Sequence, residues 1–155
     1  MANPFAHSRT FHRIGHVTNT SVWKLLPTPT GLGVLTSVGR KTGKRRTRAM
    51  RMVVADGLVY AVALLGERTD WLHNIRNDPN VRIKLGRRTH DAVARELTDP
   101  GDRARAMAAY RPIAGWYDYF DYANFVWDIP SRRKLLDVHD AWFARGVPVA
   151  FELKP

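Results

Sequence analysis

A cationic stretch that contains two glycines constrains the fold of this chain more than any other feature of its sequence. Residues 39–47 read GRKTGKRRT and carry five cationic side chains. A largely apolar run precedes this stretch at residues 32–38, and another follows it at residues 50–54. This pattern predicts two β-strands joined by a turn, because glycine permits the positive φ angles that turns need. Glycine also permits a ligand to approach the backbone closely.

The same turn is a candidate anion site. Backbone N–H groups and flexible cations suit phosphate or carboxylate groups. A basic turn that is only solvated explains these residues as well, so both interpretations stay open at this point. The stretch does not match the nucleotide-binding P-loop, which requires a glycine and then a lysine where this chain has Lys44 and Arg45.

Further hairpin signals follow the first. Asp56-Gly57 predicts a tight turn between strands at 46–55 and 58–65, and the turn at 86–88 joins strands at 81–85 and 90–97. With strands at 33–38 and 147–153, we expect about six antiparallel strands. Helices are expected at 71–77 with Asp70 as N-cap, from Asp99-Pro100 to about 110, and at 132–145 between Ser131 and Gly146. The fold class is therefore α+β, mostly β, and we expect a small barrel with flanking helices.

We expect one domain over residues 30–155, preceded by an amphipathic arm over residues 1–29 that Pro27 and Pro29 set apart. The arm is interpreted as packing on the core, or as a lid or membrane-surface anchor. His12 and His16 have helical spacing but no third ligand beside them, so we predict no metal site.

The net charge of +11 suits nucleic acid, an anionic membrane or an acidic small molecule as partner. No signature of a nucleic-acid-binding module accompanies the cations, so we expect no nucleic acid partner. The absence of cysteine excludes disulfides and thiolate metal sites. No run approaches the roughly 20 apolar residues of a membrane span, and no signal-peptide core precedes the body. We expect a cytoplasmic protein, with membrane association through the arm as an alternative.

Two aromatic segments are candidate ligand contacts. Trp71 and Asn74 share one face at the start of a short helix, although a core tryptophan and a capping asparagine explain them equally simply. Residues 116–122 read WYDYFDY. Such a cluster can grip an aromatic ligand or form a packed lid over the core.

Three segments resemble the deazaflavin (coenzyme F420)-dependent nitroreductase and quinone reductase family. Residues 35–43, LTSVGRKTG, resemble the family motif TTTGRKTG, and Arg46 matches a basic family position. Residues 71–79, WLHNIRNDP, resemble WxxNLxxNP, and residues 147–152, VPVAFE, resemble the closing segment IPVVxLEP. The resemblance implies a split β-barrel of the FMN-binding, pyridoxamine-oxidase-like type. It also implies coenzyme F420, an 8-hydroxy-5-deazaflavin, as cofactor.

The resemblance implies roles for individual residues. Arg40, Lys41 and Arg46 would hold the phosphate and carboxylates of the coenzyme. Thr42, Gly43 and Lys44 would lie nearby, Trp71 and Asn74 would line the phosphate or ribityl end, and the backbone of Ala63, Leu64 and Gly66 would face the ring. Tyr117, Tyr119 and Tyr122 are candidate proton donors or substrate clamps.

Two departures from the family pattern accompany these roles. The family's lysine after the third strand is absent from residues 63–68, ALLGER, and the segment 110–146 is longer than in compact members. The implied activity is hydride transfer from the reduced coenzyme to an electron-poor acceptor such as an enone, quinone or nitroarene. An FMN-binding oxidoreductase and a non-enzymatic carrier of an anionic aromatic ligand are the alternatives, and a homodimer is a candidate assembly.

Overall fold

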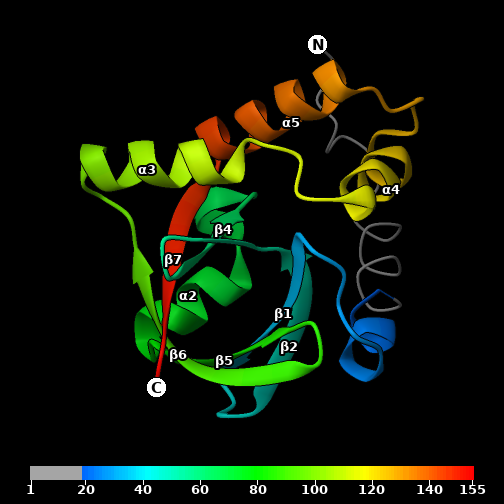
Figure 1. Cartoon of the computed structure of the whole chain (residues 1–155). Helices are drawn as coiled ribbons and strands as arrows, with labels where there is room; N and C mark the ends of the chain where they lie inside the picture. Colours follow the sequence, from blue (N-terminus) through cyan, green and yellow to red (C-terminus); the bar gives the residue numbers. More distant parts are fainter. Residues whose placement is uncertain (1–18) are drawn as a thin grey trace.

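Seven β-strands form one antiparallel sheet that curls into a split barrel (Figure 1). The computed structural model describes residues 19–155, so residues 1–18 of the expected arm, with His12 and His16, lie outside the described part. The strand order is β2-β1-β5-β6-β7-β4-β3. The strands are β1 Leu32–Val38, β2 Arg45–Arg51, β3 Val53–Ala55, β4 Leu58–Ala63, β5 Asn80–Leu85, β6 Arg88–Glu96 and β7 Val147–Leu153. The predicted fold class is confirmed.

The sheet has one strand more than the sequence predicted, because the strand expected at 46–55 is divided at Met52. The N–H of Met52 donates to the carbonyl oxygen of Gly31 at 3.0 Å. Upstream of Met52, β2 pairs with β1, and downstream of it, β3 pairs with β4. The two edge strands of the sheet are therefore consecutive in the chain, and the chain itself links the two edges of the barrel.

The predicted tight turns are confirmed by their backbone angles. Asp56 and Gly57 have φ values of 53° and 77°, which is the geometry of a two-residue hairpin turn. Gly86 has a φ of 59° in the turn between β5 and β6. These turns fix the register of the strand pairs that they join.

The helices are α2 Asp70–Asn77, α3 Pro100–Tyr110, α4 Trp116–Val126 and α5 Arg132–Arg145, with a short 3-10 helix, η1 Gly66–Arg68. Residues 19–25 are also helical. The expected caps of α3 and α5 are confirmed, since Asp99 accepts a hydrogen bond from the N–H of Asp102 and Ser131 accepts one from that of Lys134. Within residues 19–155, no helix combines the length and apolar character that a bilayer crossing needs.

Three details of the helices differ from the prediction. Thr69 is the N-cap of α2, and Asp70 is its first helical residue. Helix α4 was not expected, because its aromatic residues obscure the helical period. Gly146 follows α5 as predicted, but its φ of −89° is not left-handed. A side chain there would lie 2.3 Å from Val62 Cγ1, so close packing is what requires glycine.

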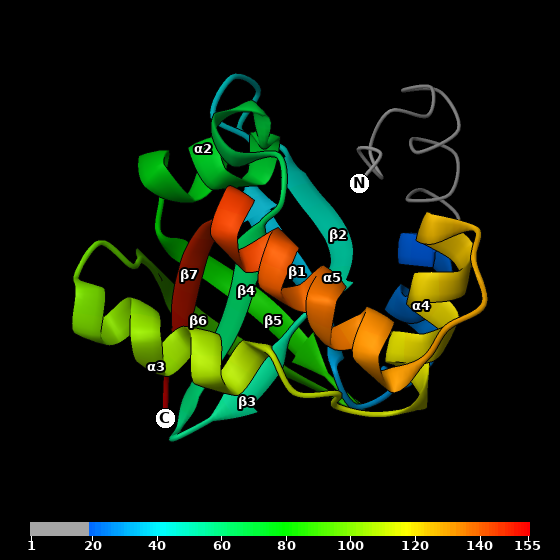
Figure 2. The same ribbon diagram turned by 90° about the horizontal axis from the view of Figure 1, so that it is seen from above.

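Within residues 19–155, the buried hydrophobic side chains form three clusters. One fills the barrel and includes Trp71, Leu72 and Ile75 of α2. The second lies between β4, β7 and the helices α3 and α5. The third joins Leu32, Val34 and Ala49 on the outer face of the β1–β2 hairpin to Tyr117 of α4 and Trp23 of the 19–25 helix. Figure 2 accordingly shows α4 beside β2, on the side away from α2.

Arg51, the last residue of β2, lies in a buried polar cluster with groups from three helices. Its Nη2 donates to the carbonyl oxygen of Pro112 at 2.7 Å and lies 3.4 Å from Asp118 Oδ2. Its Nε donates to His139 Nε2 at 3.2 Å. Its guanidinium carbon is 4.6 Å from the centroid of the Tyr110 ring, which favours a buried cation. This cluster ties α3, the α3–α4 connection, α4 and α5 to the end of β2.

His139 is neutral in this cluster. Because Arg51 Nε donates to His139 Nε2, the ring proton lies on Nδ1 and is donated to the carbonyl oxygen of Arg111 at 2.8 Å. Burial and the neighbouring charge of Arg51 together lower the pKa of His139 to about 4. The opposite shift occurs at Asp121, where burial and the nearby Asp118 raise the carboxyl pKa to about 7.

Candidate functional site

The cationic turn between β1 and β2 is held by its own hydrogen bonds. The N–H of Gly39 donates to the carbonyl oxygen of Lys44 at 2.8 Å, and the N–H of Gly43 donates to that of Gly39 at 2.8 Å. Gly43 has a φ of +67°, whereas a side chain at Gly39 would lie 3.1 Å from the oxygen of Lys44. One glycine therefore supplies the left-handed angle and the other permits close packing. The turn presents its cations on a fixed backbone.

A cavity of about 370 Å³ lies between this turn and α2. Six of the residues predicted to bind cofactor line it, namely Arg40, Lys41, Thr42, Arg46, Trp71 and Asn74. The register of β1 and β2 explains why both strands contribute side chains to this cavity, since Leu35 pairs with Arg48 and Ser37 pairs with Arg46. Directly paired residues share one face of a sheet, so these four side chains point to the same side.

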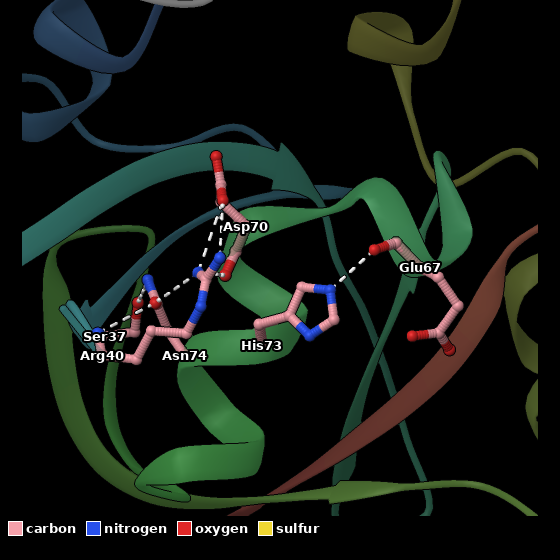
Figure 3. Close-up of polar contacts among 6 residues, drawn as sticks. All are labelled: Ser37, Arg40, Glu67, Asp70, His73 and Asn74. Carbon is pink, nitrogen blue, oxygen red and sulfur yellow. Dashed lines mark hydrogen bonds and ion pairs between the residues drawn. The ribbon is translucent and has the colours of Figure 1, made fainter.

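Asn74 joins α2 to the turn. Its side chain is buried, and its Oδ1 accepts from the N–H of Arg40 at 3.2 Å and from the guanidinium of Arg40 at 3.3 Å. Its Nδ2 donates to Ser37 Oγ at 3.5 Å, a long contact (Figure 3). These contacts differ from those of a helix cap, which was the simpler interpretation of Asn74 from the sequence. The side chain fixes the position of the turn against the helix that carries Trp71.

The charge of the cavity is strongly positive. Among its lining residues, Arg40, Lys41, Arg46 and Arg48 are cationic, and Asp70 is acidic. Burial lowers the pKa of Arg48, and the Asp70 carboxylate opposes that shift. The chemistry of this donor set suits a ligand with several phosphate or carboxylate groups.

Six lining residues are absent from the cofactor-binding set predicted from the sequence, and three of these, Ser37, Arg48 and Asp70, are charged or hydrogen-bonded to a predicted residue. Arg48 lies two positions after Arg46 on the same strand, so the strand period could have revealed it. Ser37 could have been found from its pairing with Arg46. Asp70 was expected to be an N-cap and lies instead one residue inside α2, with its carboxylate 3.3 Å from the Arg40 guanidinium.

A family model for the F420H(2)-dependent quinone reductases matches residues 7–131. The chain belongs to this family. The matched range contains the cationic turn, the cavity and all of α4, so the resemblance seen in the motifs extends over most of the chain. The protein is an F420-dependent reductase, and the cationic cavity lies where the family motifs meet.

Solved structures support the fold of this F420H(2)-dependent quinone reductase family member. An F420-H2 dependent reductase (FDR-A) has a TM-score of 0.52 and 22% identity over 80% of this chain and 94% of that chain. A structure described as a domain-swapped dimer has a TM-score of 0.55 and 19% identity over 94% of each chain. The heme storage protein HutZ from Vibrio cholerae has a TM-score of 0.52 and 12% identity over 81% and 83%.

The segment predicted to face the deazaflavin ring does not line the cavity. Ala63 is fully buried in the barrel core, and Leu64 packs against the cluster beneath α3 and α5. Gly66 begins η1 with a φ of 54°. The cavity residues therefore fit the anionic part of the coenzyme, and the contacts of the ring with residues 63–66 stay a prediction.

The three predicted catalytic tyrosines all lie on α4. The hydroxyl of buried Tyr117 donates to Asn19 Oδ1 at 3.0 Å, and that of buried Tyr122 donates to Asp128 Oδ2 at 3.3 Å. Tyr119 is 36% exposed. Because α4 packs on the face of β1 and β2 that carries Val34 and Ala49, the structure does not bring these tyrosines to the cationic cavity. Their catalytic roles stay a prediction.

A second hollow, of about 510 Å³, lies at the C-terminal end of α4. It is lined by Ala123, Asn124, Trp127, Asp128 and Ile129. Its ionisable lining residue is a carboxylate, so its charge does not suit an anionic coenzyme. Although it is larger than the cationic cavity, charge rather than volume decides which of the two fits the coenzyme.

Proposed function

We propose that the protein binds coenzyme F420 through the cationic cavity and reduces an electron-poor acceptor, such as a quinone, enone or nitroarene. The observation that carries this proposal is the convergence of four cationic side chains on one cavity in a member of this family. The coenzyme carries a phosphodiester, a lactyl carboxylate and an oligoglutamate tail, so its anionic groups complement those cations.

The residues of the cavity would have different roles in binding the coenzyme. Lys41, Arg46 and Arg48 would balance the anionic groups, while Asn74 keeps the turn in place and Trp71 provides an apolar wall. When bound in its reduced form, the coenzyme supplies the hydride. The contribution of the chain is to hold the reactants in one orientation, and positioning of this kind lowers a barrier by several kcal/mol.

Fluorescence titration of the apoprotein with oxidised coenzyme F420 tests the binding site. A charge-assisted hydrogen bond contributes about 1.5–3 kcal/mol, so Lys41→Ala and Arg46→Ala should each weaken binding by about ten- to a hundredfold. Arg87→Ala is the matched control, because Arg87 is an exposed cation in the β5–β6 turn and does not line the cavity. Equal affinity of the parent, Lys41→Ala and Arg46→Ala would remove the cavity from the proposal.

The same assay separates the alternatives. FMN has one phosphate and no oligoglutamate tail, so we expect it to bind more weakly than coenzyme F420. A screen of quinones, enones and nitroarenes, followed by the loss of absorbance of the reduced coenzyme, identifies the acceptor class. Tight binding without turnover of any acceptor would favour the carrier over the enzyme.

We also propose a homodimer, on the similarity to the solved structure described as a domain-swapped dimer. Analytical ultracentrifugation at several protein concentrations measures the mass directly. Contact of the N-terminal arm with a membrane surface stays a prediction, and flotation with anionic vesicles tests it. A monomeric mass would contradict the homodimer, and a protein that does not float with the vesicles would contradict the membrane contact.

A further inference from the structure

Arg40 already has an anionic partner. Its Nη1 and Nη2 both lie 3.3 Å from the same oxygen, Oδ1, of Asp70, and Nη1 also lies 3.4 Å from the Asp70 carbonyl oxygen. Figure 3 shows the guanidinium of Arg40 between Asp70 and Asn74. A ligand that uses Arg40 must therefore share this guanidinium with Asp70 or displace it.

The contact with Asp70 has the features of an exchangeable ion pair. Its distances are long for a charge-assisted hydrogen bond, which is typically about 2.7–2.9 Å. The side chain of Asp70 is 87% exposed, whereas that of Arg40 is 28% exposed. The carboxylate can therefore turn into solvent without unburying apolar surface. In that position it would remain in the first turn of α2, where the helix dipole favours negative charge.

Arg40 has a second partner that does not depend on Asp70. Asn74 Oδ1 accepts from both the N–H and the guanidinium of Arg40, and Asn74 is buried. If Asp70 leaves, Asn74 still holds the arginine at the edge of the cavity. Asp70 also interacts electrostatically with Arg48, so one exposed carboxylate offsets two of the cations that line the cavity.

We propose that Asp70 is an internal competitor for the anionic groups of the ligand. In the free protein its carboxylate occupies Arg40, and on binding it gives up the guanidinium to a phosphate or carboxylate oxygen of the ligand. The identity of that ligand as coenzyme F420 rests on the proposed function, but the exchange itself requires only an oxyanion. Asp70 thereby favours ligands with enough negative charge to replace it, and it lowers the affinity for those with little.

The test compares Asp70→Asn with Asp91→Asn. Both variants remove one negative charge, but Asp91 pairs with Arg82 on β5 and does not line the cavity. Binding is measured by fluorescence titration for coenzyme F420 and by NMR titration for inorganic pyrophosphate. An exposed ion pair of this kind corresponds to about a two- to fivefold change in affinity. We expect Asp70→Asn to bind both probes tighter than the parent by about this factor at low salt, with a smaller gain at high salt.

Two further measurements separate exchange at Arg40 from a general effect of charge. In an Arg40→Gln background, the gain from Asp70→Asn should fall to the smaller part that comes from the interaction of Asp70 with Arg48. The ring-ribityl fragment of the coenzyme, which lacks the phosphate and the carboxylates, should bind parent and Asp70→Asn equally. A gain no larger than that of Asp91→Asn, or a gain of the same size without Arg40, would overturn the exchange. If no variant binds the coenzyme but pyrophosphate shows the expected pattern, the exchange stands and the proposed function fails.

Discussion

Removing the charge of Asp118 should destabilise the protein much more than removing that of a surface aspartate. The side chains of Arg51 and Asp118 are 5% and 3% exposed. Breaking a buried ion pair from one side typically costs about 3–5 kcal/mol, because the remaining charge stays buried without its partner. The Pro112 carbonyl and the Tyr110 ring still contact Arg51, so we expect Asp118→Asn to cost about 3 kcal/mol, at the lower end. For a domain of this size, that lowers the Tm by about 6–12 °C.

Urea and thermal unfolding, followed by circular dichroism at neutral pH, measure this loss. Asp91→Asn is the control, because its pair with Arg82 is exposed and its removal should cost less than about 1 kcal/mol. Combining Asp118→Asn with Arg51→Met should recover part of the lost stability, since the unpaired charge is then gone. A cost for Asp118→Asn equal to that of Asp91→Asn would show that the buried cluster does not depend on this charge.

Three other predictions concern pH, packing and turnover. Because the folded pKa of His139 is about 4 and its ordinary value is 6.5, the unfolded chain binds the extra proton between these values, and stability should fall by about 3 kcal/mol as the pH falls through this range. The raised pKa of Asp121 has the opposite effect, because between pH 3.8 and about 7 the folded protein binds the extra proton and is stabilised as the pH falls. In urea unfolding, the loss of stability at acidic pH should therefore be steeper for Asp121→Asn than for the parent, and shallower for His139→Gln. Gly146→Ala should cost about 1–3 kcal/mol in thermal unfolding, because its Cβ would lie 2.3 Å from Val62 Cγ1, whereas Gly115→Ala, with its nearest contact at 3.5 Å, should cost much less. Tyr119→Phe and Tyr122→Phe should slow oxidation of the reduced coenzyme without weakening its binding, and unchanged turnover in both would exclude them from the mechanism.

Local signals in the sequence predicted much of the fold. Asp56-Gly57 identified a hairpin because its two residues accept positive φ angles, and Asp99 identified the start of α3 because its carboxylate can cap the helix. The cationic turn was found for the same reason, since its glycines and cations are neighbours in the chain. The cavity beside it followed from the family motifs, which lie on the two elements that form its walls.

Contacts between distant residues could not be predicted in this way. Arg51 looked like one more cation on a strand, yet its buried partners Asp118 and His139 lie 67 and 88 residues further along the chain. Tyr117, Tyr119 and Tyr122 looked like one cluster, but on a helix they point in different directions because each residue rotates by about 100°. The division of β2 from β3 depends on a backbone hydrogen bond to Gly31, for which the sequence around Met52 carries no signal.

The position of β2 at the edge of the sheet has a consequence for how copies of this chain meet. An edge strand offers unpaired backbone groups to any other strand, and a row of like charges is one way to discourage such pairing. Arg45, Arg46 and Arg48 lie on β2, so two copies that approached edge to edge there would repel each other. A dimer is therefore expected to use a different surface.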